Sequence, residues 1–346
     1  MKTLFNFIFV LFTLIGSLSC DSTEPIDELK PGRRDYTWSI DTLSKIAYKN
    51  SYTELWGYDP QHVWIAGDSW DLDKNILRFD GTSWHLIPIL NQPPAAWALY
   101  GIDANNIWAA GNSFWKYNGN RFEFYNKYSI QGFARILTND IYGSDISHLF
   151  AVGGAEEDTT GNLHPFILQF KNNSWELIHV DSMRGVFVYV KYSDSDPNSL
   201  YLLLSEVNSG APDYLRIFNY SNNRFTELHN NELNPSDTPW ITVLNNEATI
   251  AWDKKIFQLA NGKPKLLYDF SSTIKSHSPF WGRNIKDLFF EVEGGLGHYN
   301  GEDIKVLFPI NKKFYIMNCL FFEKQVFILF YEYESFKFYV LRGKLN

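Results

Sequence analysis

Short apolar runs alternate with polar, glycine-containing turns along most of this chain. A motif with Gly at its third position and Asp at its fifth, followed by an apolar run that ends in Gly, occurs at residues 55–67, 99–111 and 141–153. The first glycines of these copies, Gly57, Gly101 and Gly143, lie 44 and 42 residues apart. A period of this length suits one four-stranded β-unit and is too long for a leucine-rich or ankyrin repeat. The pattern therefore predicts an array of similar β-units.

The second strand of each unit is the easiest to follow. It is a mainly apolar run of four residues that occurs seven times, at residues 63–66, 107–110, 149–152, 200–203, 249–252, 288–291 and 326–329. Asp80-Gly81 and Asn118-Gly119, between apolar runs, predict type I′ hairpin turns, which need positive φ at both central residues. Seven such units predict an all-β fold, a seven-bladed β-propeller of four-stranded blades.

The last unit lacks a fourth strand of its own. Residues 336–343 supply its third strand, and Asn346 follows shortly after. Residues 37–43 resemble the fourth strand of the first unit, residues 83–89. We therefore expect an N-terminal strand to complete the last blade, which would close the ring without a covalent bond and without a large exposed edge.

Three motifs carry a resemblance to a known group of proteins. Trp-Gly-x-Asp, aliphatic-Trp-x-Ala/Val-Gly and aromatic-Asp/Asn-Gly-x-x-Trp occur at residues 56–59, 63–67 and 79–84. In this combination they resemble the repeats of secreted β-propeller proteins of Bacteroidota and related bacteria. The resemblance extends over residues 36–346 and implies the fold without implying an activity. The Asp-Gly-Thr-Ser-Trp turn at residues 80–84 lacks the Asp-x-Gly spacing of the sialidase Asp-box. No functional residue of sialidases is therefore assigned to this chain.

The N-terminal segment has the features of a targeting sequence. Lys2 precedes an apolar stretch at residues 4–15, which is short for a membrane-spanning helix and typical of a signal peptide, predicted at residues 1–19. Small residues before Cys20 resemble a bacterial lipobox, which implies a lipidated Cys20, although Ser17 stands where the lipobox prefers Leu. Residues 20–34 are then a flexible tether and residues 35–346 the propeller.

The targeting sequence also sets the expected location. A lipidated Cys20 implies an outer-membrane lipoprotein of the cell envelope, either facing inward or displayed on the outer surface. The alternative is a secreted or periplasmic protein cleaved near Ser19. If Cys20 carries lipid, the other cysteine, Cys319, has no disulfide partner, and its apolar surroundings predict a buried core residue.

Composition narrows the range of partners. The formal net charge is −8, which becomes −9 if Lys2 is removed with the signal peptide, and no basic run is longer than a doublet. These features disfavour nucleic acid as a partner and predict membrane contact only through the lipid. Aromatic residues make up 17% of the chain, which suits the cores between stacked sheets. No motif for a metal or a cofactor is present, and we expect a monomer.

Candidate site residues come from the loops between second and third strands and from the predicted starts of inner strands. Variable loops on a rigid scaffold commonly carry function, so we expect the site on the face that bears these loops, over the central channel. Trp70 and Asp71 offer an aromatic ring and a carboxylate, whereas Glu156 and Glu157 offer paired carboxylates for acid–base work. Four further residues are predicted to line the channel mouth, with core packing as the alternative: Trp97, Arg135, Trp240 and Phe280.

Three functions fit this description. The first is a non-enzymatic binding module that recognises an extracellular glycan or protein. The second is a polysaccharide-active hydrolase or lyase that uses the loop carboxylates. The third is an envelope assembly scaffold that holds other outer-membrane proteins.

Overall fold

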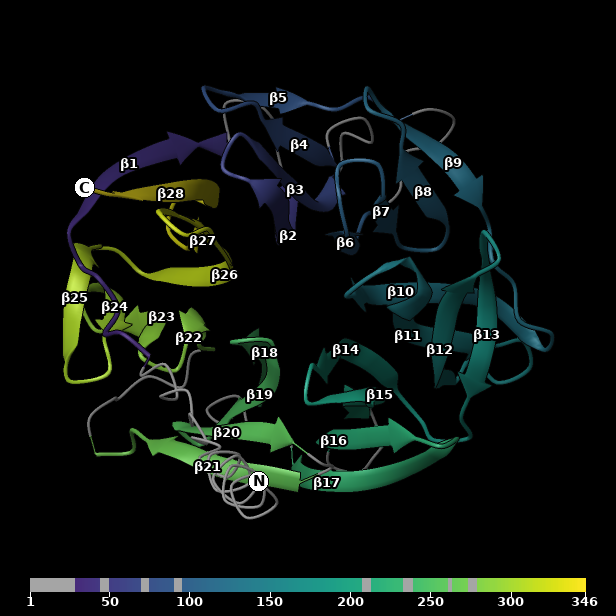
Figure 1. The fold of residues 1–346 in the computed structure, drawn as a ribbon. Coiled ribbons are helices and arrows are strands. Elements are labelled where there is room, and N and C mark those ends of the chain that lie inside the picture. Colours follow the sequence, from purple (N-terminus) through teal and green to yellow (C-terminus); the bar gives the residue numbers. More distant parts are fainter. Residues whose placement is uncertain are drawn as a thin grey trace, which may run out of the picture. The chain divides into compact units, whose positions relative to one another are not determined.

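The described part of the chain is folded entirely into small antiparallel sheets. The computed structural model describes residues 29–43, 50–69, 75–89, 95–206, 213–232, 239–260, 263–272 and 279–346. Within these ranges 28 strands form seven four-stranded sheets, which stand around a central axis in one structural unit, Pro31–Asn346 (Figure 1). The predicted all-β, seven-bladed propeller is therefore confirmed. Trp70, Asp71, Cys20 and the predicted signal peptide lie outside the described residues.

Blades 1 to 4 follow one another in chain order. Blade 1 contains β2 (Asn50–Asp59), β3 (His62–Ser69), β4 (Ile76–Phe79) and β5 (Trp84–Leu86). Blade 2 contains β6 (Ala98–Gly101), β7 (Ile107–Ala110), β8 (Phe114–Tyr117) and β9 (Phe122–Asn126). Blade 3 contains β10 (Phe133–Gly143), the short 3-10 helix η2 (Ile146–His148), β11 (Leu149–Glu157), β12 (Leu163–Lys171) and β13 (Ser174–Val180). Blade 4 contains β14 (Val186–Ser193), β15 (Asp196–Glu206), β16 (Tyr214–Ser221) and β17 (Arg224–Glu232).

Blades 5 to 7 complete the ring. Blade 5 contains β18 (Trp240–Leu244), β19 (Glu247–Trp252), β20 (Lys255–Ala260) and β21 (Lys263–Asp269). Blade 6 contains β22 (Trp281–Asn284), β23 (Asp287–Val292), β24 (Gly295–Tyr299) and β25 (Ile304–Pro309). Blade 7 contains β26 (Phe314–Phe321), β27 (Gln325–Glu332), β28 (Lys337–Leu345) and the N-terminal strand β1 (Tyr36–Thr42). The first strand of blades 1 to 6, and β26 of blade 7, is the innermost (Figure 1).

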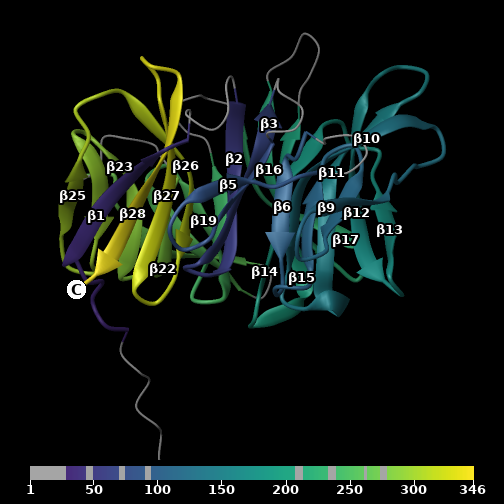
Figure 2. The ribbon, with the colours of Figure 1, turned by 90° about the horizontal axis from the view of Figure 1, so that it is seen from above.

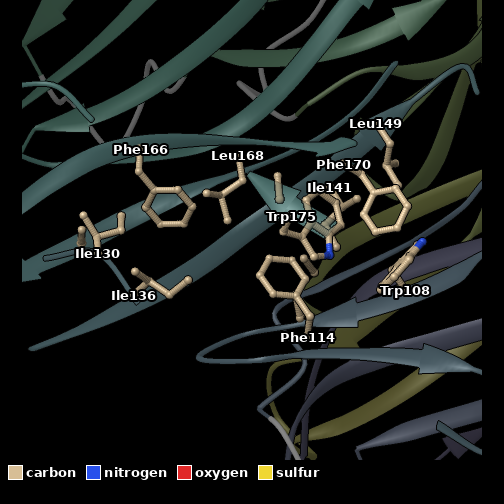
Figure 3. Packing of buried hydrophobic residues seen from close by; sticks show 14 residues of the cluster. Trp108, Phe114, Ile130, Ile136, Ile141, Leu149, Phe166, Leu168, Phe170 and Trp175 are labelled. Carbon is tan, nitrogen blue, oxygen red and sulfur yellow. The ribbon is translucent and has the colours of Figure 1, made fainter. Parts of the chain in front are cut away.

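The hydrophobic core lies between neighbouring blades, as the high aromatic content suggested. Figure 3 shows one cluster in which Trp108 and Phe114 of blade 2 face Phe170 and Trp175 of blade 3. The rings of Phe114 and Trp175 stack with centroids 4.6 Å apart, and Trp108 meets Trp175 edge-on at 5.6 Å. Burial of one such side chain contributes about 1.5–3 kcal/mol, so these interfaces supply much of the stability.

The aromatic residue before the motif glycine links the inner strands of blades 1, 2 and 3. Ring centroids of Trp56 and Tyr100 are 6.3 Å apart, and those of Tyr100 and Tyr142 are 5.3 Å apart. A Cβ added to Gly101 would stand only 2.5 Å from the Trp56 ring, so this position requires glycine for the close approach of blade 1 to blade 2. The Trp-Gly motif is thus a packing device between blades.

The tight turns differ from the expected geometry in one respect. Asp59 accepts a hydrogen bond from the Gln61 amide at 2.7 Å, and Asp103 does the same for Asn105, as turn-capping aspartates should. In the Asp80-Gly81 turn only Gly81 has positive φ, because the Asp80 carboxylate instead accepts from the Thr82 and Ser83 amides. The type I′ prediction is therefore wrong for this turn, and it is wrong for Asn118-Gly119 too, where only Gly119 has positive φ. Both central residues have positive φ at the Asn-Asn turns, residues 172–173 and 222–223.

The N-terminal strand closes the ring. Strand β1 pairs antiparallel with β28 over seven residues, from Tyr36 opposite Leu345 to Thr42 opposite Tyr339. Asp41 of β1 lies 2.7 Å from the guanidinium of Arg342, and it accepts a hydrogen bond of 2.9 Å from the indole of Trp84 in blade 1. The closing strand therefore ties blade 7 to blade 1. Cys319 of β26 is buried, and burial raises the pKa of its thiol well above the usual value.

Candidate functional site

Blade 3 gathers three of the residues selected from the sequence. The Arg135 guanidinium on β10 lies 2.5 Å from the Glu156 carboxylate on β11, where the two residues are register partners. Glu157, the next residue, accepts a hydrogen bond from the Thr160 hydroxyl and lies 3.8 Å from His164. Each of these carboxylates thus already has a partner within the protein, and Arg135 is the most exposed member of its ion pair.

The three aromatic candidates occupy different environments. Phe280 is buried and packs against Phe270 and Phe290, at ring-centroid distances of 5.7 and 4.9 Å, so it belongs to the core between blades 5 and 6. Trp97 is half-buried directly before β6. Trp240 is half-buried at the start of the innermost strand of blade 5. Of the three, Trp240 stands beside the polar cluster described next.

That polar cluster lies where the innermost strands meet around the axis. A β-bulge interrupts the first strand of blades 1, 3 and 4, at Thr53, Asn139 and Val188. The residue that follows the bulge is Glu54 in blade 1, Asp140 in blade 3 and Tyr189 in blade 4. We call Glu54, Asp140, Tyr189, Lys191 and Trp240 the axial cluster. Bulges commonly redirect side chains near functional sites.

An ion pair and a backbone hydrogen bond hold Asp140 and Lys191 of the axial cluster in place. The Lys191 ammonium lies 2.6 Å from the Asp140 carboxylate, which also accepts a 2.9 Å hydrogen bond from the Val190 amide. The side chains of Asp140 and Lys191 are only 12% and 15% exposed. A buried ion pair of this kind is costly to desolvate, and it is retained only where geometry and additional hydrogen bonds compensate.

Glu54 joins this pair from a blade that is not its neighbour. The pKa of Glu54 is raised to about 8, mainly by burial and further by the negative charge of Asp140, while the positive charge of Lys191 partly opposes the rise. Glu54 and Lys191 belong to blades 1 and 4, which blades 2 and 3 separate in the ring, so their interaction places both side chains toward the axis. A carboxyl group perturbed in this way is a candidate functional group.

Aromatic side chains complete the cluster. The rings of Tyr189 and Trp240 meet edge-on with centroids 4.5 Å apart, and Trp240 meets Trp281 at 5.5 Å. Burial raises the pKa of Tyr189 well above its usual value, and the charges of Glu54 and Asp140 add to this effect. Glu54, Tyr189, Lys191 and Trp240 all keep partial solvent exposure despite their place on innermost strands.

A second group of residues stands exposed on blade 7. Tyr315, Tyr333 and Phe336 are 43%, 49% and 74% exposed, and their rings form a row with centroid distances of 6.4 and 6.3 Å. Phe336 has a φ of 56° in the β27–β28 turn, a conformation that a bulky residue rarely adopts. Figure 2 shows this hairpin rising on the side opposite the C-terminus. We call these three residues the aromatic row.

Sequence reasoning selected only Trp240 from these two groups. One feature of the sequence could have indicated the aromatic row. Two aromatic residues flank Glu334 and Ser335 in a turn, where polar residues are usual. Within the described ranges, no group of three or more His, Cys, Asp or Glu side chains could hold a metal ion. The described residues also include no helix with the length and hydrophobicity of a membrane span.

Comparison with known proteins adds information on the fold. The chain matches no protein-family model and no curated protein sequence. Among solved structures, the extracellular domain described for a hybrid two-component system of B. thetaiotaomicron aligns with a TM-score of 0.56 and 14% identity, over 88% of this chain and 42% of that one. A puromycin-hydrolyzing peptidase of Mycobacterium tuberculosis aligns with a TM-score of 0.53 and 11% identity, over 90% and 56%.

A third solved structure matches over nearly its whole length. A protein from Lactobacillus plantarum aligns with a TM-score of 0.50 and 9% identity, over 83% of this chain and 96% of that one. This chain therefore spans about half the length of the first two proteins and nearly all of the third. At these identities the likeness shows the fold alone, and a fold does not by itself imply a function.

Proposed function

We propose that this protein is an extracytoplasmic binding module that recognises a glycan or protein ligand with its loop face and its axial cluster. The observation that carries the proposal is the meeting of Glu54, Asp140 and Lys191 from three blades at the axis. Blade packing alone would be served better by apolar side chains, since burying ionisable groups costs desolvation free energy. Residues that oppose stability in this way are typical of ligand sites.

The aromatic row supports the same proposal on the loop face. Exposed aromatic rings bury large areas on contact, and they are enriched where proteins recognise partners. Phe336 combines high exposure with strained backbone geometry, and strain of this kind is commonly retained for function. The faces of Tyr315, Tyr333 and Phe336 can stack on sugar rings or on apolar side chains of a protein.

We further propose that the module is anchored to the outer membrane through lipid on Cys20. The lipobox-like sequence before Cys20 supports this location, and so does the fold's likeness to a domain described as extracellular. Mass spectrometry of the protein purified from membranes would show the added acyl groups on Cys20. A Cys20→Ser variant should be released in soluble form, and membrane retention of this variant would refute the anchor.

A binding screen tests the proposed function. Immobilised wild-type protein would be presented with a glycan array and with extracellular proteins, alongside the variants Glu54→Gln and Phe336→Ser. We expect a ligand whose affinity falls at least tenfold in both variants. The matched control is Leu266→Ser, which removes a similarly exposed apolar side chain from the outermost strand β21. Equal loss in the control, or full binding by both site variants, would contradict the proposed site.

A polysaccharide hydrolase is the second candidate, and one observation favours it. The protein holds Glu54 protonated near neutral pH beside a second carboxyl group, Asp140, and glycoside hydrolysis uses one protonated and one ionised carboxyl group. Screening polysaccharides for turnover with wild type, Glu54→Gln and Asp140→Asn would decide. Turnover lost in both variants would establish this function, and turnover that survives in both would exclude these residues from catalysis.

A further inference from the structure

The axial cluster contains more acidic groups than basic ones. Two carboxyl groups, Glu54 and Asp140, face a single ammonium group, Lys191, and Lys191 is committed to Asp140 at 2.6 Å. Within the described part of the chain, the Glu54 carboxyl has no hydrogen-bond partner, whereas Asp140 has two. Among the residues that the structure describes, no other charged side chain acts on Glu54. The fold therefore presents one carboxyl group that lacks a counter-ion.

The aromatic residues beside Glu54 favour positive charge. An aromatic face attracts a cation placed within about 6 Å of the ring centroid. Lys191 already uses this interaction, with its ammonium 4.7 Å from the Tyr142 centroid and 5.6 Å from the Tyr189 centroid. The ring of Trp240 extends the aromatic wall beyond Tyr189. A carboxyl group without a counter-ion next to aromatic rings has the chemistry of an organic-cation site.

We propose that the axial cluster binds a cationic group of the ligand, an ammonium or a guanidinium, with Glu54 as counter-ion and Tyr189 and Trp240 as the aromatic wall. The proposal rests on the proposed function, because it takes the axial cluster as the place where the ligand binds. An organic monocation fits these residues, since one free carboxyl group and two rings offer too few oxygen ligands for a divalent metal.

Binding of a cation at this site exchanges it for a proton. In the free protein Glu54 is protonated at neutral pH, because burial raises its pKa to about 8. The cation pairs with the ionised carboxylate, so the protein releases one proton on binding. Among the described residues, the groups that face Glu54 are Asp140, Lys191 and Tyr189. Burial raises the pKa of Asp140 as well, and Lys191 and the Val190 amide oppose that rise, whereas the pKa of Tyr189 is too high for it to titrate in this range. Affinity should therefore rise about 90-fold from pH 6 to pH 9 and level off above pH 8.

The test uses two small cations as probes, n-butylammonium and n-propylguanidinium, at constant ionic strength. Both keep their charge across this pH range. Isothermal titration calorimetry at pH 6, 7, 8 and 9 would measure affinity, and buffers of different ionisation enthalpy would count the protons released. We expect up to one proton per cation below pH 8. The neutral probe 1-butanol and the anion butyrate should bind at least tenfold more weakly at pH 8.

Two variants separate a site effect from a general charge effect. Glu54→Gln keeps the shape of the side chain and should lower cation affinity at least tenfold and abolish its pH dependence. Glu302→Gln removes one negative charge from an exposed turn and should leave both unchanged. Affinity independent of pH in the wild type, equal binding of 1-butanol, or unchanged binding in Glu54→Gln would each overturn the proposal.

The outcome also separates this inference from the proposed function. If a glycan or protein ligand found in the binding screen depends on Glu54 while neither cation binds, the cationic preference is wrong and the binding module stands. If the cations bind with proton release but no ligand depends on the axial cluster, the proposed function fails and the cation site stands.

Discussion

Replacement of Glu54 by Gln should make the protein more stable, and increasingly so as pH rises. In the unfolded chain Glu54 ionises near its ordinary pKa of 4.5, whereas in the folded protein burial keeps it protonated up to about pH 8. Between these values the folded state binds one more proton than the unfolded state, so its stability falls as pH rises. A neutral Gln of the same shape removes this dependence.

The size of the effect follows from the two pKa values. Each pH unit between them is worth about 1.4 kcal/mol, so ionisation of Glu54 costs the folded protein about 5 kcal/mol above pH 8. Between pH 5 and pH 8 the stability advantage of Glu54→Gln over wild type should grow by about 3.5 kcal/mol. This is a large fraction of the 5–15 kcal/mol that typically holds a domain folded.

Urea unfolding of the two proteins at pH 5, 6, 7 and 8 would measure this advantage. Tryptophan fluorescence would follow the transition, and the Glu302→Gln variant would serve as control because its exposed carboxyl group has no comparable environment. A difference between Glu54→Gln and wild type that stays constant from pH 5 to pH 8 would refute the assigned burial of Glu54. A variant that loses stability with rising pH faster than wild type would reverse the sign of the reasoning.

Three further changes test the architecture. Deleting residues 36–43 should lower the melting temperature by about 10 °C, because the deletion removes the closing strand and the buried Leu43, and an unchanged melting temperature would refute closure by this strand. Gly101→Ala should cost about 1–3 kcal/mol in urea unfolding because its Cβ meets the Trp56 ring, and adding Trp56→Leu should recover part of this loss. Asp41→Asn should cost about 1–3 kcal/mol by leaving Arg342 without its ion partner, and a loss no larger than for Asp303→Asn would contradict this role.

The fold could be predicted from the sequence because its determinants are local. Residues 63–66 and 107–110 are apolar runs of strand length between turns, and these runs are the cores of β3 and β7. Glycines and aspartates at fixed offsets marked the turns, so the number of blades followed from counting. The match of residues 37–43 to the outer strand of blade 1 predicted the closing strand, which the pairing of β1 with β28 confirms.

The axial cluster could not be predicted in the same way. Glu54 and Asp140 are isolated acids in segments of mixed polarity, and nothing near them in sequence marks them as partners. They come together only because bulges at Thr53 and Asn139 shift the register of their strands, and because the ring brings non-adjacent blades to one axis. A single shifted residue decides which face of a strand a side chain occupies. Sequence periodicity carries no information about such shifts.

The closing strand has a consequence for the order of events in folding. Asp41 and Arg342, which it brings together, lie 301 residues apart in the chain. Ribosomes deliver β1 first and its partner β28 last, so six blades can form while the seventh waits for both ends. Once β28 has formed, and until β1 docks on it, β28 presents an unpaired edge, the kind of surface to which strands of other molecules add. Docking of β1 should therefore set the rate at which this ring completes. It should also set how long the unpaired edge of β28 is open to aggregation.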